Sequence, residues 1–138
     1  MLYSTRPKIS FVVNKVYQFI ARPLDSHWIV VKRILRNLTG TLFHGLHFQP
    51  ASFDHPLSLK ASCDADWASD VDGRRSTSGA AIFLGPNLIS WSSRKQQATT
   101  WSSVEAKYRS LAKTSTELPR ISTLLTKLQI SFTTPVFL

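Results

Sequence analysis

The stretch Leu57-Ser58-Leu59-Lys60-Ala61-Ser62-Cys63-Asp64 decides the fold of this chain. Apolar and polar side chains alternate along it, which predicts a strand with one apolar face. That face carries Leu57, Leu59, Ala61 and Cys63. A strand that is half apolar needs partners on its edges and a cover for its apolar face.

The neighbouring segments predict the rest of a sheet. Residues 80–84 and 88–92 are two further strands, and Gly85-Pro86-Asn87 is the turn between them. Residues 41–48 alternate loosely and would pair with residues 57–63 across a proline-flanked loop.

One main helix follows the strands. Ser102 or Ser103 is its expected N-cap. Pro119 should kink or break it, with a second helical piece running to about Gln129. Residues 135–138 then begin another strand, so the whole is an α/β (α+β) chain.

Two helices are expected before the sheet. Pro7 suits the first helical position, and Pro23 ends the apolar periodicity that follows it. Asp25 or Ser26 can cap a second helix, and Gly40 can close it. Its apolar stripe, expected to pack in a core, is Trp28, Val31, Leu35 and Leu38. Its basic side holds Lys32, Arg33 and Arg36.

Composition limits the partners. The 138 residues hold 17 Lys+Arg and 8 Asp+Glu, a formal charge of +9. A surplus of this size favours polyanions as partners, and a basic surface that serves only solubility is about as good an explanation. No apolar run reaches the roughly 20 residues that span a bilayer. Neither a membrane partner nor a signal peptide is expected, and the lone Cys63 excludes an internal disulfide. The four tryptophans are expected to build core.

The acids gather after the first strand. They are Asp64, Asp66, Asp70 and Asp72. Carboxylates at a strand end, facing acids on a neighbouring helix, are what two-metal phosphoryl chemistry needs. Taken alone, a solvated acidic loop is the better explanation of this turn.

Two groups of motifs carry a family resemblance. The first resembles the end of a copia-type retrotransposon reverse transcriptase: Arg6-Pro7-Lys8-Ile9-Ser10-Phe11, Gln18-Phe19, His27-Trp28, Lys32-Arg33-Ile34-Leu35-Arg36 and Gly40-Thr41. The second resembles the ribonuclease H domain that follows it: Asp64-Ala65-Asp66-Trp67-Ala68, Arg74-Arg75-Ser76-Thr77-Ser78-Gly79, Ile89-Ser90-Trp91-Ser92-Ser93 and Ser102-Ser103-Val104-Glu105-Ala106-Lys107-Tyr108. Order and spacing match over nearly the whole chain, which therefore resembles a fragment of a copia-type Pol polyprotein.

The resemblance implies two segments. Residues 1–50 would be a helical remnant of the reverse transcriptase C-terminal region, and residues 51–138 a truncated ribonuclease H-like domain. The implied fold of the second is an antiparallel three-stranded meander, one main helix, and a strand parallel to the first, which makes the sheet mixed.

The implied activity is Mg²⁺-dependent cleavage of the RNA strand of an RNA–DNA hybrid. Asp64 matches the family's catalytic aspartate, with Asp66 the weaker candidate. The family's helix motif has a metal-binding glutamate where this chain has Lys107, a cation with no acceptor. Glu105 cannot replace it, since two residues along a helix turn by about 200°. The family's next aspartate would lie beyond Leu138. We therefore expect a vestigial site, a pseudoenzyme with no functional metal.

Nucleic-acid affinity could outlast catalysis, because phosphate contacts need only cations on one face. The candidates are Arg74 and Arg75 in a hairpin loop and Lys32, Arg33 and Arg36 on the second helix. An RNA–DNA hybrid is the expected ligand, in the cytoplasm or nucleus. A merely solvated turn explains the hairpin arginines nearly as well.

A second function stays open. Arg33-Ile34-Leu35-Arg36 matches the Arg-x-Leu-Arg motif and resembles the translocation signal of secreted oomycete effectors. In that case the chain would be secreted and would bind a protein inside a host cell. The basic helix of the reverse-transcriptase resemblance explains the same four residues.

The apolar end of the chain has a further implication. An unpaired strand edge at Val136 to Leu138 predicts marginal stability and self-association through that edge.

Overall fold

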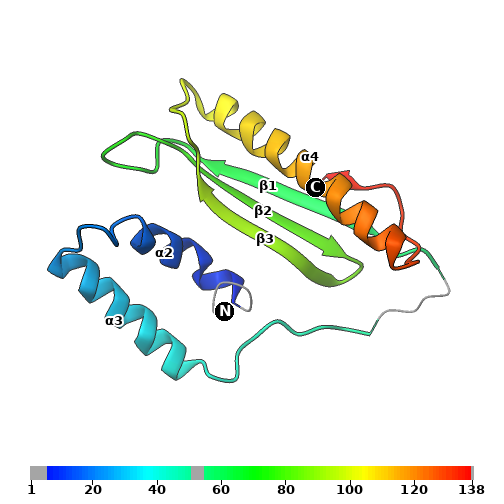
Figure 1. Cartoon of the computed structure of the whole chain (residues 1–138), viewed down its shortest axis with the longest axis horizontal. Helices are drawn as coiled ribbons and strands as arrows, with labels where there is room; N and C mark the ends of the chain where they lie inside the picture. The colour runs from blue at the N-terminus through cyan, green and yellow to red at the C-terminus, as the bar shows by residue number, and fades with distance from the viewer. Residues whose placement is uncertain (1–5, 51–54, 138) are drawn as a thin grey trace. The chain divides into compact units, whose positions relative to one another are not determined.

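The computed structural model describes residues 6–50 and 55–137, and they form two compact units that divide between Leu46 and His47 (Figure 1). The division lies near the expected segment boundary at residue 50. The assignment of the two units to reverse transcriptase and ribonuclease H stays a prediction. None of the helices in the described part of the chain combines the length and the apolar character needed to cross a bilayer.

The first unit holds helices α2 (Pro7–Tyr17) and α3 (Asp25–Gly40), as the prolines and Gly40 predict. Arg6 joins the start of α2 to the segment after α3. Its guanidinium donates to Thr41 Oγ1 at 2.8 Å and to the Leu42 carbonyl at 3.0 Å. The ring of Phe19 stacks on His27, with 4.1 Å between ring centroids, which closes the connection between the helices.

The apolar stripe expected on α3 is wrong in two of its four members. Trp28 and Leu35 are 54% and 50% exposed, whereas Val30 and Ile34 are half-buried. Within this unit α3 packs against α2 alone, so a narrow strip of the helix is covered and no residue of α3 is buried. Trp28 instead carries the Lys32 ammonium over its ring, 5.6 Å from the centroid.

The second unit contains the mixed sheet. Its strands are β1 (Leu59–Asp66), β2 (Thr77–Leu84), β3 (Asn87–Lys95) and β4 (Val136–Phe137), and α4 (Ser103–Lys127) lies between β3 and β4 in the chain. The strand order is β3-β2-β1-β4. β1, β2 and β3 form an antiparallel meander, and β4 pairs with β1 in parallel at two positions. The expected α+β class and strand directions are confirmed.

The strand expected at residues 41–48 and the break expected at Pro119 are both wrong. Residues 41–48 form no strand, and the edge of β1 opposite β2 pairs with β4 at Lys60 and Ala61 instead. Pro119 does not break α4, which is helical from Ser103 to Lys127. A proline inside a helix costs about 3 kcal/mol. Leu118 and Leu125 of α4 are both 5% exposed, and burial of each contributes about 1.5–3 kcal/mol, which offsets that cost.

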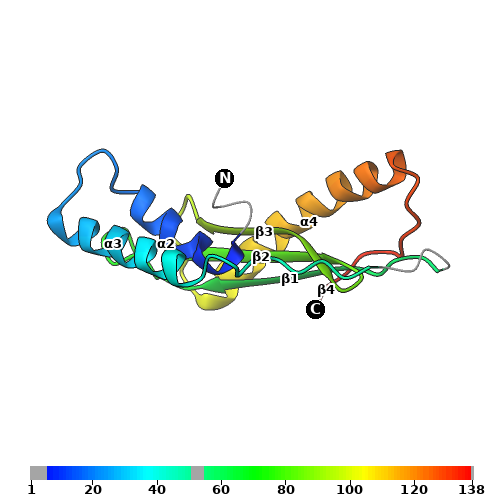
Figure 2. The same ribbon diagram turned by 90° about the horizontal axis from the view of Figure 1, so that it is seen from below.

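The core lies between α4 and the apolar face of the sheet. Leu59, Ala61 and Ile82 meet Leu118 and Leu125 there. Figure 2 shows α4 running obliquely beside the long strands. The tryptophans do not build this core: Trp28, Trp67 and Trp101 are 54%, 43% and 95% exposed. Trp67 and Trp101 lie in connections outside the sheet, where α4 does not cover them.

Candidate metal centre and cation surfaces

The open end of β1 brings Asp64 near α4. Among the described residues, β4 pairs with β1 at Lys60 and Ala61 alone, and no described strand pairs with that edge of β1 beyond them. The Ser110 hydroxyl of α4 donates to the backbone carbonyl of Asp64 at 2.8 Å. That bond fixes α4 against the end of the strand. Lys107 comes to the same place, because it precedes Ser110 by three residues on one helix face.

Asp64 faces a cation. The Lys107 ammonium lies 3.7 Å from Asp64 Oδ1, and the side chains of Lys107 and Asp64 are 65% and 80% exposed. The same Oδ1 accepts the backbone N–H of Ala65 at 2.8 Å. The structure thus brings together Asp64 and the residue that stands where the resemblance implies a glutamate.

A metal set does not form at this end of the sheet. Asp66 is exposed two residues further along β1. Among residues 6–50 and 55–137, no three His, Cys, Asp or Glu side chains come close enough to hold a metal ion. A site for Mg²⁺ needs several converging oxygen ligands, and the neighbour that the described structure gives Asp64 is positively charged.

Glu105 is engaged at the start of α4. Its carboxylate accepts the Trp101 backbone N–H at 2.8 Å and the Arg109 guanidinium at 2.8 and 3.1 Å. The hydrogen bond from Trp101, followed by Arg109, holds the pKa of Glu105 below its usual value. Ser102, the expected N-cap, accepts the Glu105 backbone N–H at 3.1 Å. Glu105 therefore stabilises the helix start, and its carboxylate is directed to Trp101 and Arg109.

The hairpin arginines stand on a loop that Asp70 organises. Asp70 Oδ2 accepts the Gly73 backbone N–H at 2.8 Å and pairs with the Lys95 ammonium at 2.5 Å. The bond from Lys95 is the main reason that the pKa of Asp70 is lowered. Arg74, at a φ of 51°, and Arg75 are exposed on the outside of this loop. No local pattern indicates the Asp70–Lys95 pair, since the two residues meet only when β2 and β3 fold back.

The cations of α3 belong to the other unit. Lys32, Arg33 and Arg36 are all exposed there. In the motif Arg33-Ile34-Leu35-Arg36, Ile34 is half-buried and the other three are exposed. The two sets of candidate cations are therefore carried by separate units, one on residues 6–46 and one on the hairpin loop.

Comparison with known proteins supplies the origin of the chain. It is 47% identical over 131 residues to the Retrovirus-related Pol polyprotein from transposon RE2 of Arabidopsis thaliana, and 48% identical over 131 residues to that from transposon RE1 of the same plant. Each alignment covers 95% of this chain and 9% of the polyprotein. The chain is also 38% identical over 117 residues to the Secreted RxLR effector protein 161 of Plasmopara viticola, covering 85% of this chain and 80% of that protein. No family model and no solved structure matches.

These relatives place the chain among the proteins of retrotransposon origin, and its α+β fold is the one that the resemblance implies. Within that class the chain belongs to the retrovirus-related Pol polyproteins of copia-type transposons, as the sequence motifs predict. It spans about a tenth of the length of the RE1 and RE2 polyproteins, 9% in each case.

Proposed function

We propose that the chain is a ribonuclease H-like segment that binds nucleic acid and does not cleave it. One observation carries the proposal: the Lys107 ammonium stands 3.7 Å from Asp64 Oδ1. A cation at this distance neutralises the carboxylate that would otherwise attract Mg²⁺, and its N–H groups cannot act as metal ligands.

The chemistry of cleavage explains why this replacement is decisive. Two-metal hydrolysis needs a pair of ions roughly 3.5–4 Å apart, one for the attacking oxygen and one for the leaving oxygen. Each ion needs several oxygen ligands. Asp64, with Asp66 beside it, offers too few carboxylates for two ions, and Lys107 adds repulsion.

Binding rests on the cations. The chain has a net charge of +9, and Arg74, Arg75, Lys32, Arg33 and Arg36 are exposed. Each phosphate contact releases counterions, so the affinity for an RNA–DNA hybrid should be highest at low salt and fall steeply as salt rises. Lack of binding at low salt would refute the retained affinity.

The test of inactivity is a cleavage assay. A labelled RNA–DNA hybrid is incubated with the full chain and Mg²⁺, and Asp64→Asn serves as the control. We expect equal background rates for both proteins. If the unmodified chain cleaves the hybrid and Asp64→Asn abolishes cleavage, then Lys107 does not stand at the missing ligand position and the proposal is wrong.

The comparison with the Plasmopara viticola protein favours a second candidate, a secreted effector that acts by interaction inside a host cell. Its support is the 80% of that effector that the alignment covers, together with the motif Arg33-Ile34-Leu35-Arg36. The test is a secretion assay on the native chain, with the double variant Arg33→Ala/Arg36→Ala as control. If the native chain stays inside the producing cell, this candidate fails.

A further inference from the structure

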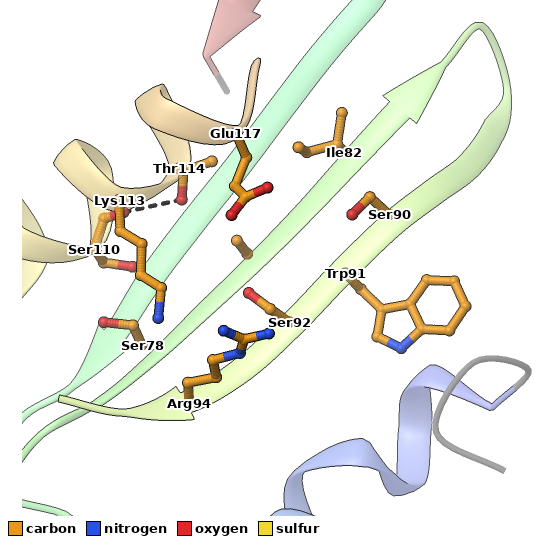
Figure 3. Close-up of a pocket in the computed structure, with 11 residues that line it drawn as sticks. Ser78, Ile82, Ser90, Trp91, Ser92, Arg94, Ser110, Lys113, Thr114 and Glu117 are labelled. Carbon is orange, nitrogen blue, oxygen red and sulfur yellow. Dashed lines mark hydrogen bonds between the residues drawn. The ribbon is translucent and has the colours of Figure 1, made fainter. Parts of the chain in front are cut away.

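A pocket lies between α4 and the β2–β3 half of the sheet (Figure 3). Its volume is about 100 Å³. The backbone of α4 packs on β1 and β2 and not on β3. Between α4 and β3 there are therefore only side chains, and the pocket lies among them. Among the residues of β3 that line the pocket, Ser90 and Ser92 have small side chains, which leaves space beneath the longer side chains of Arg94 and Lys113.

Hydroxyl groups line this pocket. Ser78 comes from β2, Ser90 and Ser92 come from β3, and Ser110 and Thr114 come from α4. The two hydroxyls of α4 are used as donors, to the carbonyls of Asp64 and Ser110. Ser78 Oγ accepts from Gln96 Nε2 at 2.8 Å, which leaves its own hydrogen free to donate. Within the described residues, the hydroxyl groups of Ser90 and Ser92 donate no hydrogen bond to the protein.

Two cations stand over the hydroxyls. Figure 3 shows Arg94 reaching from β3 and Lys113 from α4 toward one another. Neither forms an ion pair with an acid of the described residues. Both side chains are exposed at their outer ends. Partial desolvation, and then the charge of Arg94, lower the pKa of Lys113, and Glu117 opposes the shift. Two cations that face one another, neither of them in an ion pair within the described part of the chain, favour an anion between them.

We propose that this pocket binds a phosphate group. Arg94 and Lys113 would hold its charge, and the hydroxyls of Ser78, Ser90 and Ser92 would donate to its oxygens. Glu117 also lines the pocket and repels an anion, although Arg120 lies 3.7 Å from its carboxylate. The source is either free phosphate or a nucleic-acid backbone, and only the second rests on the proposed function.

The test is a titration of the full chain with inorganic phosphate, in which binding is measured by calorimetry and by NMR. Unmodified protein should bind saturably. Arg94→Gln and Lys113→Gln should each weaken binding about tenfold or more, the effect of losing one charge-assisted hydrogen bond. Glu117→Gln should strengthen binding, since it removes the opposing charge. Lys127→Gln is the matched control, an exposed cation of the same helix outside the pocket, and should change nothing.

A second readout separates binding from a structural effect. Bound phosphate should raise the pKa of Lys113, measured from the NMR signal of its ε-carbon. The charged groups facing Lys113 are Arg94 from β3 and Glu117 from its own helix, and β2 contributes no titratable residue to the lining. No saturable binding, or equal loss in Lys127→Gln, would overturn the proposal.

An RNA–DNA hybrid added in competition identifies the source. If the hybrid displaces phosphate, the pocket binds backbone phosphate. If the hybrid does not displace phosphate, the pocket binds free phosphate. Hybrid binding without phosphate binding, unaffected by Arg94→Gln, overturns this inference and leaves the proposed function standing. Phosphate binding without hybrid binding supports the pocket and overturns nucleic-acid binding.

Discussion

Replacing Lys107 by glutamate should turn an ion pair into a metal-responsive site. Lys107→Glu places a carboxylate beside Asp64, where the ammonium now lies 3.7 Å from Asp64 Oδ1. Without metal the two carboxylates repel each other. With Mg²⁺ they can share one ion, since carboxylate oxygens are its preferred ligands.

The size of the effect follows from exposure. Lys107 and Asp64 are 65% and 80% exposed, so water screens their attraction, and pairs of this kind contribute about 0.2–1 kcal/mol. Loss of the attraction and a repulsion of similar size should lower the free energy of unfolding by about 1 kcal/mol. In a unit of this length that lowers Tm by roughly 4–8 °C. Mg²⁺ at ten times its Kd should return about 1.4 kcal/mol.

The assay is thermal unfolding of the full chain over a series of Mg²⁺ concentrations. Lys107→Gln is the matched control, because it removes the cation and supplies no carboxylate. Only Lys107→Glu should gain Tm with Mg²⁺, and cleavage of a hybrid should stay near background because no third acid joins the pair within the described residues. If Lys107→Gln responds to Mg²⁺ as strongly, or Lys107→Glu does not respond at all, position 107 is not where a metal ligand would stand.

Three other outcomes are expected. Gly73→Ala should lower the free energy of unfolding by about 1 kcal/mol in chemical denaturation, because a Cβ would lie 2.6 Å from Asp70 Oδ2 and displace its hydrogen bond. The lowered pKa of Asp70, caused mainly by Lys95, means that Asp70 stabilises the fold above its ordinary pKa of 3.8 and loses that effect as the pH falls through its lowered value. Asp70→Asn should therefore be less stable at pH 7 and less sensitive to acid below about pH 4. Val136 and Phe137 are 55% and 40% exposed on an edge strand, so Val136→Lys should reduce self-association in sedimentation, and unchanged association would exclude this edge.

The sheet was predictable because its signals are local. Alternation along residues 57–64 anticipates the buried pair Leu59 and Ala61, and Gly85 at a φ of 58° makes the turn between β2 and β3. Asn87 pairs with Leu84 across that turn. The alternation of a strand and a turn residue with positive φ depend on neighbouring residues, so both can be predicted without the rest of the fold.

The expectations for residues 41–48 and Pro119 were wrong because residues distant in the sequence determine the structure at both places. The sequence of residues 41–48 alternates as a strand would, yet residues 41–43 form a turn, and β4, more than 80 residues later, pairs with β1 at Lys60 and Ala61. Pro119 opposes a helix locally, and the burial of Leu118 and Leu125 against the sheet outweighs it. The same limit hid the phosphate pocket, because Arg94 and Lys113 come together only after α4 has settled on β1 and β2.

In the second unit, the residues that build the core differ from the residues of the candidate metal site. Leu59, Ala61 and Ile82 build the core with Leu118 and Leu125, and neither Asp64 nor Lys107 is part of it. Ser110 fixes the position of α4 through the backbone carbonyl of Asp64, so the helix stays in place whatever side chain stands at position 107. A lysine there is 65% exposed and costs the fold little, while it reverses the sign of the charge beside Asp64. Under the proposed function, a change at position 107 therefore alters the metal chemistry far more than the stability of the fold.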